Sequence, residues 1–523
     1  MTHTQSFLIV LGSLLFTFGL EDVAARQDSA SSISATSNAS SSNAALLNNE
    51  KLSALLPRWR QAMETFKVPG VAVAVVVDDE TILLETLGTR DIRTGKPVTP
   101  DTPFYLASCT KGFTATAIMQ LVEWKQVDLD APVQTYLPRF ELADSDASRT
   151  ITVRDLLCHG QGLGGGYLSW LEAYTGEITE DRFYHFLKQV RPEGRFRYSN
   201  LNYTLAGRII EAVTGKTWKT ILTERIFKPL GMTSTTCYAD ELYARDDVAM
   251  PTEFLDGRIT VTATRKTDRT MHAAGGNAAS IHDIVKWMRF QLGTSSHDEV
   301  LTRESVHLMH RLHAKQQREL SVPGQVRTGY GFGWNLGTYK GMSLLEHGGG
   351  FAGTSVAVTL VPDRKTGIAV LCNAGAPIPP YFTADVLDLM VGETPGDALQ
   401  KRRERFARWS AEQDRRRKEA RAVKDEAIQS RAALMKYRGR YEHEHWGSVR
   451  LSAVGDGLSC FMGVLPLTPQ VFKDHRFYAT TDTGTEFFGR FELDDNGRPA
   501  ALLLGIVSDD EFERFERVSA GTE

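Results

Sequence analysis

The residues best suited to chemistry in this sequence begin with a serine and a lysine. Ser108 and Lys111 frame the stretch Ser108-Cys109-Thr110-Lys111, at the start of a helical pattern over 110–125. Residues three apart on a helix share a face, so hydroxyl and amine are expected side by side. A lysine in a dry site loses proton affinity and can accept the hydroxyl proton, while a helix start favours the developing anion. Alone, the spacing also fits an N-capping serine with a solvated lysine.

A second candidate group is Tyr198-Ser199-Asn200, in a turn-rich stretch before a predicted helix over 203–214. A tyrosine phenol can act as a base or proton shuttle where nearby cations hold down its pKa, and Lys111 is the candidate cation. Asn200 offers both a donor and an acceptor to a substrate amide. A packed tyrosine and a helix-capping asparagine would produce the same pattern.

The third group is His347-Gly348-Gly349-Gly350, which precedes a predicted strand from Ser355. Glycines allow a backbone to approach a ligand closely, and a backbone N–H there can complete an oxyanion hole. A tight glycine turn with a structural histidine is the alternative.

The elements that must position these groups are strands at both ends of a long segment, with helices between them. Strands are predicted at 71–77 and 82–87, and a hairpin pairs 355–361 with 367–373. This order indicates a sheet built from both ends of one domain, with an inserted helical subdomain. The predicted fold class is therefore α/β (α+β), an antiparallel sheet flanked by helices, in a catalytic domain over 46–395.

The C-terminal third has a different organisation. Residues 396–436 form a charged linker, in which a helix over 401–421 holds ten Lys or Arg against four Asp or Glu. From Tyr437 the apolar period becomes two. The candidate strands there are 449–454, 458–462, 476–480, 486–493, 500–507 and 511–515. Such a meander most readily closes into a small β-barrel over 437–523, because closure removes exposed edges.

The N-terminus predicts export to the periplasm or the extracellular space. Residues 7–20 are apolar but short for a membrane span, and Val23-Ala24-Ala25 offers small residues for cleavage after Ala25. The prediction is a signal peptide over 1–25 and a flexible Ser/Ala/Asn-rich spacer over 26–45, with an uncleaved anchor as the alternative.

Composition and residue spacing argue against nucleic-acid binding, a disulfide framework and a metal site. The net charge of −4 gives no reason to expect nucleic acid as a partner. Five cysteines are few and odd in number, without the spacing of a disulfide framework. Glu442-His443-Glu444-His445 could present two histidines to a metal, but with no third ligand a polar strand face is the better interpretation.

Taken together, the three groups resemble a known family. Their order and separations are similar to those of class C serine β-lactamases and D-Ala-D-Ala carboxypeptidases, the penicillin-recognising serine hydrolases that include the S12-like peptidases. The segment 151–163, Pro229-Leu230-Gly231-Met232 and Ala274-Gly275-Gly276-Asn277 are similar to further landmarks of that family. The resemblance covers about 46–375, and the C-terminal barrel resembles a lipocalin-like module found in members that act on peptides containing D-residues.

The resemblance implies a role for each candidate residue. Ser108 would be the acylated nucleophile, Lys111 and Tyr198 would move protons, and Asn200 would hold the substrate amide. The oxyanion hole would come from the N–H groups of Ser108 and Gly350. His347 and Gly349 would line the substrate site.

One position departs from the β-lactamase pattern. His347 stands where β-lactamases carry the lysine of K-T-G, and Gly348 replaces the threonine. A neutral imidazole gives no fixed cation for a drug carboxylate, so efficient β-lactam hydrolysis is not expected. A histidine here resembles the peptidases and esterases of the group instead.

The implied activity is that of a serine hydrolase acting through an acyl-enzyme on a small peptide or amide. A D-amino-acid-specific peptidase or carboxypeptidase is the leading hypothesis, with no metal or cofactor, and with a small-molecule or peptide substrate such as cell-wall peptide. A carboxylesterase or weak β-lactamase on the same site remains open. So do two other classes, a sensor of β-lactam or cell wall that stays acylated and a pseudoenzyme whose barrel binds a ligand. The oligomeric state is also left open.

Overall fold

The central feature of the computed structural model is a nine-stranded sheet in the order β3-β2-β1-β13-β12-β11-β10-β9-β8. The structure describes residues 47–255, 257–422, 427–428, 430–506 and 512–518, so the predicted signal peptide and spacer lie outside it. The sheet strands are β1 (Gly70–Val77), β2 (Glu80–Asp91), β3 (Lys96–Pro97), β8 (Ala314–Glu319), β9 (Gln325–Tyr330), β10 (Asn335–Tyr339), β11 (Met342–Phe351), β12 (Thr354–Val361) and β13 (Thr366–Cys372).

The sheet joins the two ends of the catalytic unit. β1 pairs antiparallel with β13, so that Val71 lies opposite Cys372. The apolar run of β1 is continuous because both faces of the strand are covered. Val71, Val73 and Val75 pack into one core cluster, whereas Ala72 and Ala74 pack into the other. The prediction of an antiparallel sheet flanked by helices is confirmed.

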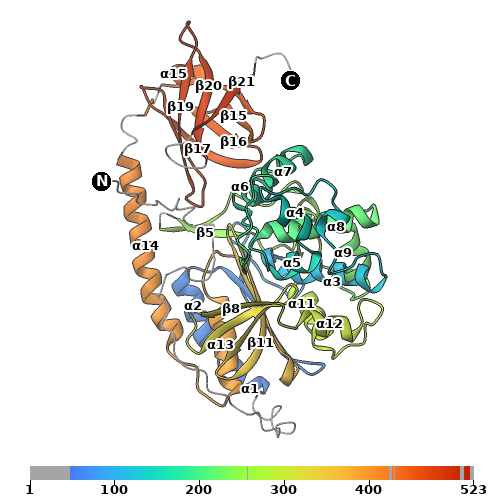
Figure 1. Ribbon diagram of the computed structural model, residues 1–523. Coiled ribbons are helices and arrows are strands. Elements are labelled where there is room, and N and C mark those ends of the chain that lie inside the picture. The colour runs from blue at the N-terminus through green and yellow to red at the C-terminus, as the bar shows by residue number, and fades with distance from the viewer. Residues whose placement is uncertain (1–46, 256, 423–426, 429, 507–511, 519–523) are drawn as a thin grey trace, which may run out of the picture.

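Different helices cover the two faces of the sheet (Figure 1). On one face lie α2 (Leu56–Phe66) and α13 (Pro379–Met390), whose buried side chains share a cluster with the outer residues of β1. On the other face lie α11 (Ile281–Leu292) and the inserted helices. The inserted helices that position the site are α3 (Thr110–Glu123), α5 (Val153–Cys158), α7 (Glu180–Leu187), α8 (Asn200–Thr214) and α9 (Trp218–Leu222).

The central helix of the insertion, α3, is buried along almost its whole length, from Thr110 to Leu121. Its small and apolar residues allow neighbours to pack on every side. α8 begins three residues before the predicted start, because the Ser199 side chain accepts a hydrogen bond from the Leu201 N–H and caps the helix. The remaining short elements are α1 (Asn49–Ser53), α4 (Ser145–Thr150), α6 (Gly166–Trp170), α10 (Ala239–Ala244), α12 (Arg303–Met309), α15 (Arg431–Leu434), β4 (Phe104–Tyr105), β5 (Thr252–Leu255), β6 (Arg258–Val261) and β7 (Ala278–Ala279).

A closed eight-stranded barrel forms the C-terminal unit, as predicted. Its strands are β14 (Gly439–His443), β15 (Gly447–Val454), β16 (Gly457–Met462), β17 (Leu465–Val471), β18 (Arg476–Thr480), β19 (Glu486–Leu493), β20 (Pro499–Gly505) and β21 (Phe512–Arg517). Sequence analysis missed β14 and β17. β17 contains Pro466 and Pro469, which cannot donate ladder hydrogen bonds and which therefore argue against a strand when read locally.

Helix α14 (Ala398–Ala422) connects the two units and runs along the side of the molecule (Figure 1). Near its start, Phe406 packs edge-on against Phe66 of α2, with ring centroids 5.1 Å apart. Within the described ranges, no helix has the length and apolarity needed to cross a bilayer.

The turns at one end of the barrel lie on the inserted helical region. In the β16–β17 turn, the Val464 N–H donates to the Thr175 carbonyl at 2.9 Å. After the β14–β15 turn, the Ser448 hydroxyl donates to the Glu177 carboxylate at 2.9 Å. Beyond β18, the Asp482 carboxylate accepts from the hydroxyl of Thr262 at 2.6 Å. Three turns of the barrel therefore fix it against the catalytic unit.

Candidate active site

The predicted nucleophile lies at a sharp turn between a short strand and the buried helix α3. After β4, Ala107 adopts a φ of 46°, in the left-handed region that an alanine rarely visits. A single 3-10 turn over Ala107–Cys109 then continues into α3, which leaves Ser108 partly exposed at the helix start. The strained backbone directs the hydroxyl into the site and orients the Ser108 N–H with the free donors of the helix start.

Lys111 lies beside this hydroxyl and is completely buried. Its Nζ is 3.0 Å from the Ser108 Oγ, 2.8 Å from the Asn200 Oδ1 and 2.8 Å from the Ala274 carbonyl oxygen. Burial lowers the pKa of Lys111 well below its ordinary value. A neutral amine has two N–H donors and one lone pair. The two carbonyl oxygens take the donors, so the lone pair is left for the Ser108 proton.

Tyr198 closes the other side of Lys111. The Lys111 Nζ lies 4.9 Å from the centre of the tyrosine ring. Burial raises the pKa of the Tyr198 phenol, and a hydrogen bond with Ser108 only partly opposes the rise. Tyr198 is therefore a neutral phenol whose proton is available to a leaving group, rather than a phenolate base.

His347 is held as a neutral ring. Its Nδ1 lies 2.7 Å from the Gly348 carbonyl, which can only accept, so the ring proton is on Nδ1. The Nε2 then accepts from the Tyr330 hydroxyl at 3.0 Å. Burial lowers the pKa of His347 to about 3. Both ring nitrogens are used inside the protein, and the ring carries no charge at neutral pH.

The predicted glycine segment is the end of β11, and it passes directly beside the nucleophile turn. A Cβ on Gly349 would lie 2.1 Å from the Leu106 carbonyl oxygen, so only glycine fits there. β10 pairs with β11 only as far as Glu346, while β12 pairs with it through Phe351. From His347 onward the second edge of β11 is thus unpaired. Gly350 is exposed on this segment, where its N–H can serve with that of Ser108 as an oxyanion hole.

The structure thus brings all seven predicted site residues to one place, and it adds two that the sequence alone did not single out. The first is Arg327 on β9, whose charge reaches Tyr198 and His347. Its guanidinium pairs with Glu346 at 2.7 Å, and both side chains are 17% exposed. The charge of Arg327 is therefore already neutralised by a carboxylate.

His159 is a second addition, within the segment 151–163 that carried the family resemblance. It is buried, its ring lies 4.6 Å from that of Tyr198, and its Nδ1 accepts from the Asn202 amide at 2.7 Å. These contacts orient Tyr198. His159 and Asn202 did not stand out in the sequence, because 43 positions separate them.

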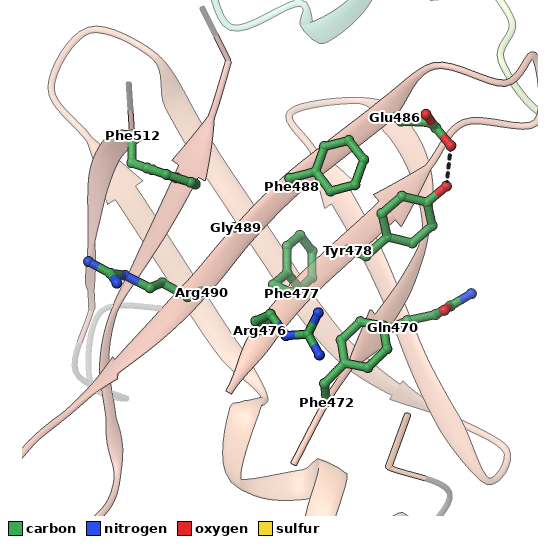
Figure 2. Close-up of a pocket in the computed structure, with 10 residues that line it drawn as sticks. All are labelled: Gln470, Phe472, Arg476, Phe477, Tyr478, Glu486, Phe488, Gly489, Arg490 and Phe512. Carbon is green, nitrogen blue, oxygen red and sulfur yellow. Dashed lines mark hydrogen bonds between the residues drawn. The ribbon is translucent and has the colours of Figure 1, made fainter. Parts of the chain in front are cut away.

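Two other features lie away from the nucleophile. Among the described residues no group of three His, Cys, Asp or Glu side chains could hold a metal ion, and His443 instead contacts Glu513 at 3.3 Å. A cavity of about 480 Å³ lies on the barrel, lined by aromatic and charged side chains of β17–β19 and by Phe512 (Figure 2). In it the Tyr478 hydroxyl donates to Glu486 at 2.5 Å. None of the predicted catalytic residues lines this cavity.

Comparison with known proteins assigns the catalytic unit to a family. The family described as Beta-lactamase matches residues 58–392. The match spans more than half of the chain, and the protein therefore belongs to this β-lactamase family of serine hydrolases.

Individual relatives agree with this assignment. Penicillin-binding protein 4 of Amycolatopsis lactamdurans is 28% identical over 364 residues, which cover 65% of this chain and 90% of the relative. The unguisins hydrolase of Aspergillus violaceofuscus is 27% identical over 344 residues, or 60% of each chain. The octameric penicillin-binding protein homologue of Pyrococcus abyssi superposes with a TM-score of 0.58 at 24% identity, over 90% of this chain and 100% of that one. At that identity the superposition establishes the fold alone.

Proposed function

We propose that this serine hydrolase cleaves amide bonds of small peptides through an acyl-enzyme on Ser108, with peptides containing D-residues as the leading substrates. The arrangement around Lys111 is the observation that carries the proposal. A buried amine whose donors are both taken by Asn200 and Ala274 has only its lone pair for the serine proton. The preference for D-residues is supported by the resemblance of the barrel to the module found in such peptidases.

In the acylation step, the Lys111 Nζ takes the Ser108 proton as Oγ attacks the substrate carbonyl. The N–H groups of Ser108 and Gly350 stabilise the oxyanion. Tyr198 then donates its phenolic proton to the departing nitrogen and recovers one from the Lys111 ammonium. The C–N bond breaks, and the acyl group stays on Oγ. Water repeats the sequence in reverse and releases the acid.

The neutral state of His347 favours a second candidate, a carboxylesterase on the same site. A substrate with a free C-terminal carboxylate would need a cation near its scissile bond. His347 is uncharged, and Arg327 is paired with Glu346. Substrates with an amidated or esterified end are therefore expected to be accepted at least as well as free carboxylates.

A substrate panel tests the proposal directly. Purified protein is given peptides with D- or L-residues, their C-terminal amides, p-nitrophenyl esters and nitrocefin, with Ser108→Ala as the matched control. Turnover of D-residue peptides or their amides, lost in the control, supports the peptidase. Turnover of esters alone establishes the carboxylesterase, and a burst of acylation without steady turnover establishes a sensor.

Export of the protein remains a separate proposal, supported by the apolar segment 7–20 and the small residues that follow it. It predicts that the mature N-terminus begins at Arg26. N-terminal sequencing of protein secreted by a bacterial host tests this. A mature chain that still begins at Met1 would support the anchor instead.

A further inference from the structure

We infer that a row of three aromatic side chains, Trp170, Tyr174 and Phe351, forms the subsite for the acyl part of the substrate and selects a large uncharged side chain there. This assignment of the aromatic row rests on the proposed function and adds to it the class of substrate.

The direction of the acyl part follows from the position of the proton donor. Tyr198 must reach the leaving group, and its ring lies 6.1 Å from that of His347, at the beginning of the unpaired edge of β11. The oxyanion donor Gly350 lies further along this edge, and Phe351 follows it. A strand advances about 3.4 Å per residue, so Phe351 is about 13 Å from His347. With the leaving group at the His347 end, the acyl part extends toward Phe351.

The aromatic row begins at this end of the strand. The Tyr174 ring stacks on Phe351 with centroids 5.0 Å apart, and Trp170 stacks on Tyr174 at 6.1 Å. All three side chains are partly exposed. Burial raises the pKa of the Tyr174 phenol, so its hydroxyl is protonated and uncharged at neutral pH. Partly exposed faces of uncharged aromatic rings bind large apolar groups.

Three titratable groups near the row are buried behind it. Lys266 is only 3% exposed, and its Nζ donates to the Ala173 carbonyl at 2.8 Å beneath the Phe351 ring, 4.0 Å from its centre. Burial raises the pKa of the neighbouring Glu172 carboxyl and lowers that of the His272 imidazole. The partly exposed surface of the row itself therefore consists of uncharged aromatic side chains. A charged substrate side chain would lose its hydration there without gaining a partner.

The barrel keeps the row in place. Phe487 of β19 contacts Trp170, with centroids 5.9 Å apart. The Thr175 carbonyl, one residue after Tyr174, accepts from Val464 of the β16–β17 turn at 2.9 Å. Lys266 connects the same segment to the end of β11. The aromatic row thus belongs to the catalytic unit, and the barrel packs against it.

Phosphonate esters that label the nucleophile test the subsite without requiring turnover. Matched probes carry a methyl, benzyl, carboxymethyl or aminobutyl side chain at the acyl position, and the second-order rate of Ser108 labelling is measured by intact mass. The benzyl probe should label roughly ten to a hundred times faster than the methyl probe, the usual range for added apolar groups in a fitted pocket. Both charged probes should label more slowly than the benzyl probe.

Three variants assign this preference to the row. Tyr174→Ala should bring the benzyl-to-methyl ratio close to one, whereas Tyr174→Phe should retain it. Phe488→Ala, on the outer surface of the barrel, is the matched control and should leave the ratio unchanged. Labelling by the methyl probe reports whether each variant is folded. Should Tyr174→Ala destroy that labelling, Phe351→Leu serves in its place, with the same loss of preference expected.

The outcomes separate this inference from the proposed function. Equal labelling by benzyl and methyl probes in the wild-type protein, or an unchanged ratio in Tyr174→Ala, overturns the inference even if peptides are hydrolysed. A ratio that depends on Tyr174 supports the subsite even if no peptide is turned over, in which case the proposed peptidase activity is wrong.

Discussion

The site is lined by different kinds of side chain on the two sides of Ser108. Toward Tyr198 and His347 the site is polar and closed, and both ring nitrogens of His347 have hydrogen-bond partners in the chain. Toward Phe351 it is aromatic and open, and the Lys266 amine is buried behind the rings. The difference reflects the two tasks around one nucleophile, proton transfer and substrate recognition. Proton transfer needs fixed partners, whereas recognition of a substrate needs surface that no internal partner occupies.

The largest expected effect is on the nucleophile shared by both sides. Ser108→Ala removes the atom that becomes acylated, so turnover should fall by a factor on the order of 10³ or more. A fluorophosphonate should add one adduct to the wild-type chain and none to the variant, as read by intact mass. An adduct that persists in Ser108→Ala would show that another hydroxyl reacts.

The polar side should act as one unit. Lys111→Met and Tyr198→Phe should each lower kcat by about a hundredfold or more, and the double variant should lose little beyond the worse single one. The buried amine must be neutral to accept the serine proton, so activity rises with pH through its pKa. That acid limb should lie well below pH 10.5. A wild-type turnover for Tyr198→Phe on every substrate would make this tyrosine purely structural.

Because His347 is uncharged, its contribution to substrate binding should not depend on pH. The pKa of about 3 means that the imidazole is already neutral at pH 5 and does not titrate between pH 5 and 9. The ratio of kcat/KM for a free peptide carboxylate and its amide should therefore stay constant across this range. His347→Lys should favour the carboxylate by about tenfold, the scale of one charge-assisted hydrogen bond. A ratio that falls between pH 5 and 8 in the wild type would instead reveal an imidazolium.

The smallest effect concerns the lysine behind the aromatic side. Burial lowers the pKa of Lys266 from 10.5 to about 7, so above pH 7 the unfolded chain holds a proton that the folded chain has lost. Stability then increases with pH, by up to about 1.4 kcal/mol per pH unit from this group. Lys266→Met should remove that contribution from urea unfolding curves between pH 7 and 8.5. The cysteines, whose thiols begin to ionise in the unfolded chain over this range, contribute equally in both proteins. Parallel pH dependences in the two proteins would contradict it.

Local spacing explains which parts of the site could be predicted. Ser108 and Lys111 lie within one helical turn, and the glycines of 348–350 lie along one strand, so residue types in sequence predict their neighbourhood. The aromatic row could not be found in this way. Tyr174 and Phe351 come from separate segments, and each reads as an ordinary core residue until the fold stacks them. The Arg327–Glu346 pair was missed for the same reason, since only the strand pairing brings it beside His347.

For the fold too, the elements set by local sequence could be predicted, and those set by distant contacts could not. The continuous apolar run of β1 predicted a buried strand, and the hairpin of β12 and β13 was predicted from its turn. The strand β17 was not predicted, because prolines locally disfavour a strand and only the closed barrel accommodates them here. The start of α8 was set by a serine cap that the helical periodicity alone does not reveal.

The pairing of β1 with β13 has a consequence for how the chain must assemble. The Gly70 N–H donates to the Asn373 side chain across 303 positions, and β1 has its second sheet neighbour only when that distant strand has been synthesised. Until then the run Val71–Val77 has β2 on one side and an apolar, unpaired edge on the other. Such long-range closure is slow, because loop entropy is lost before the contacts are gained. A ribosome-bound chain that ends before residue 366 should therefore contain a formed helical insertion and an unfinished sheet.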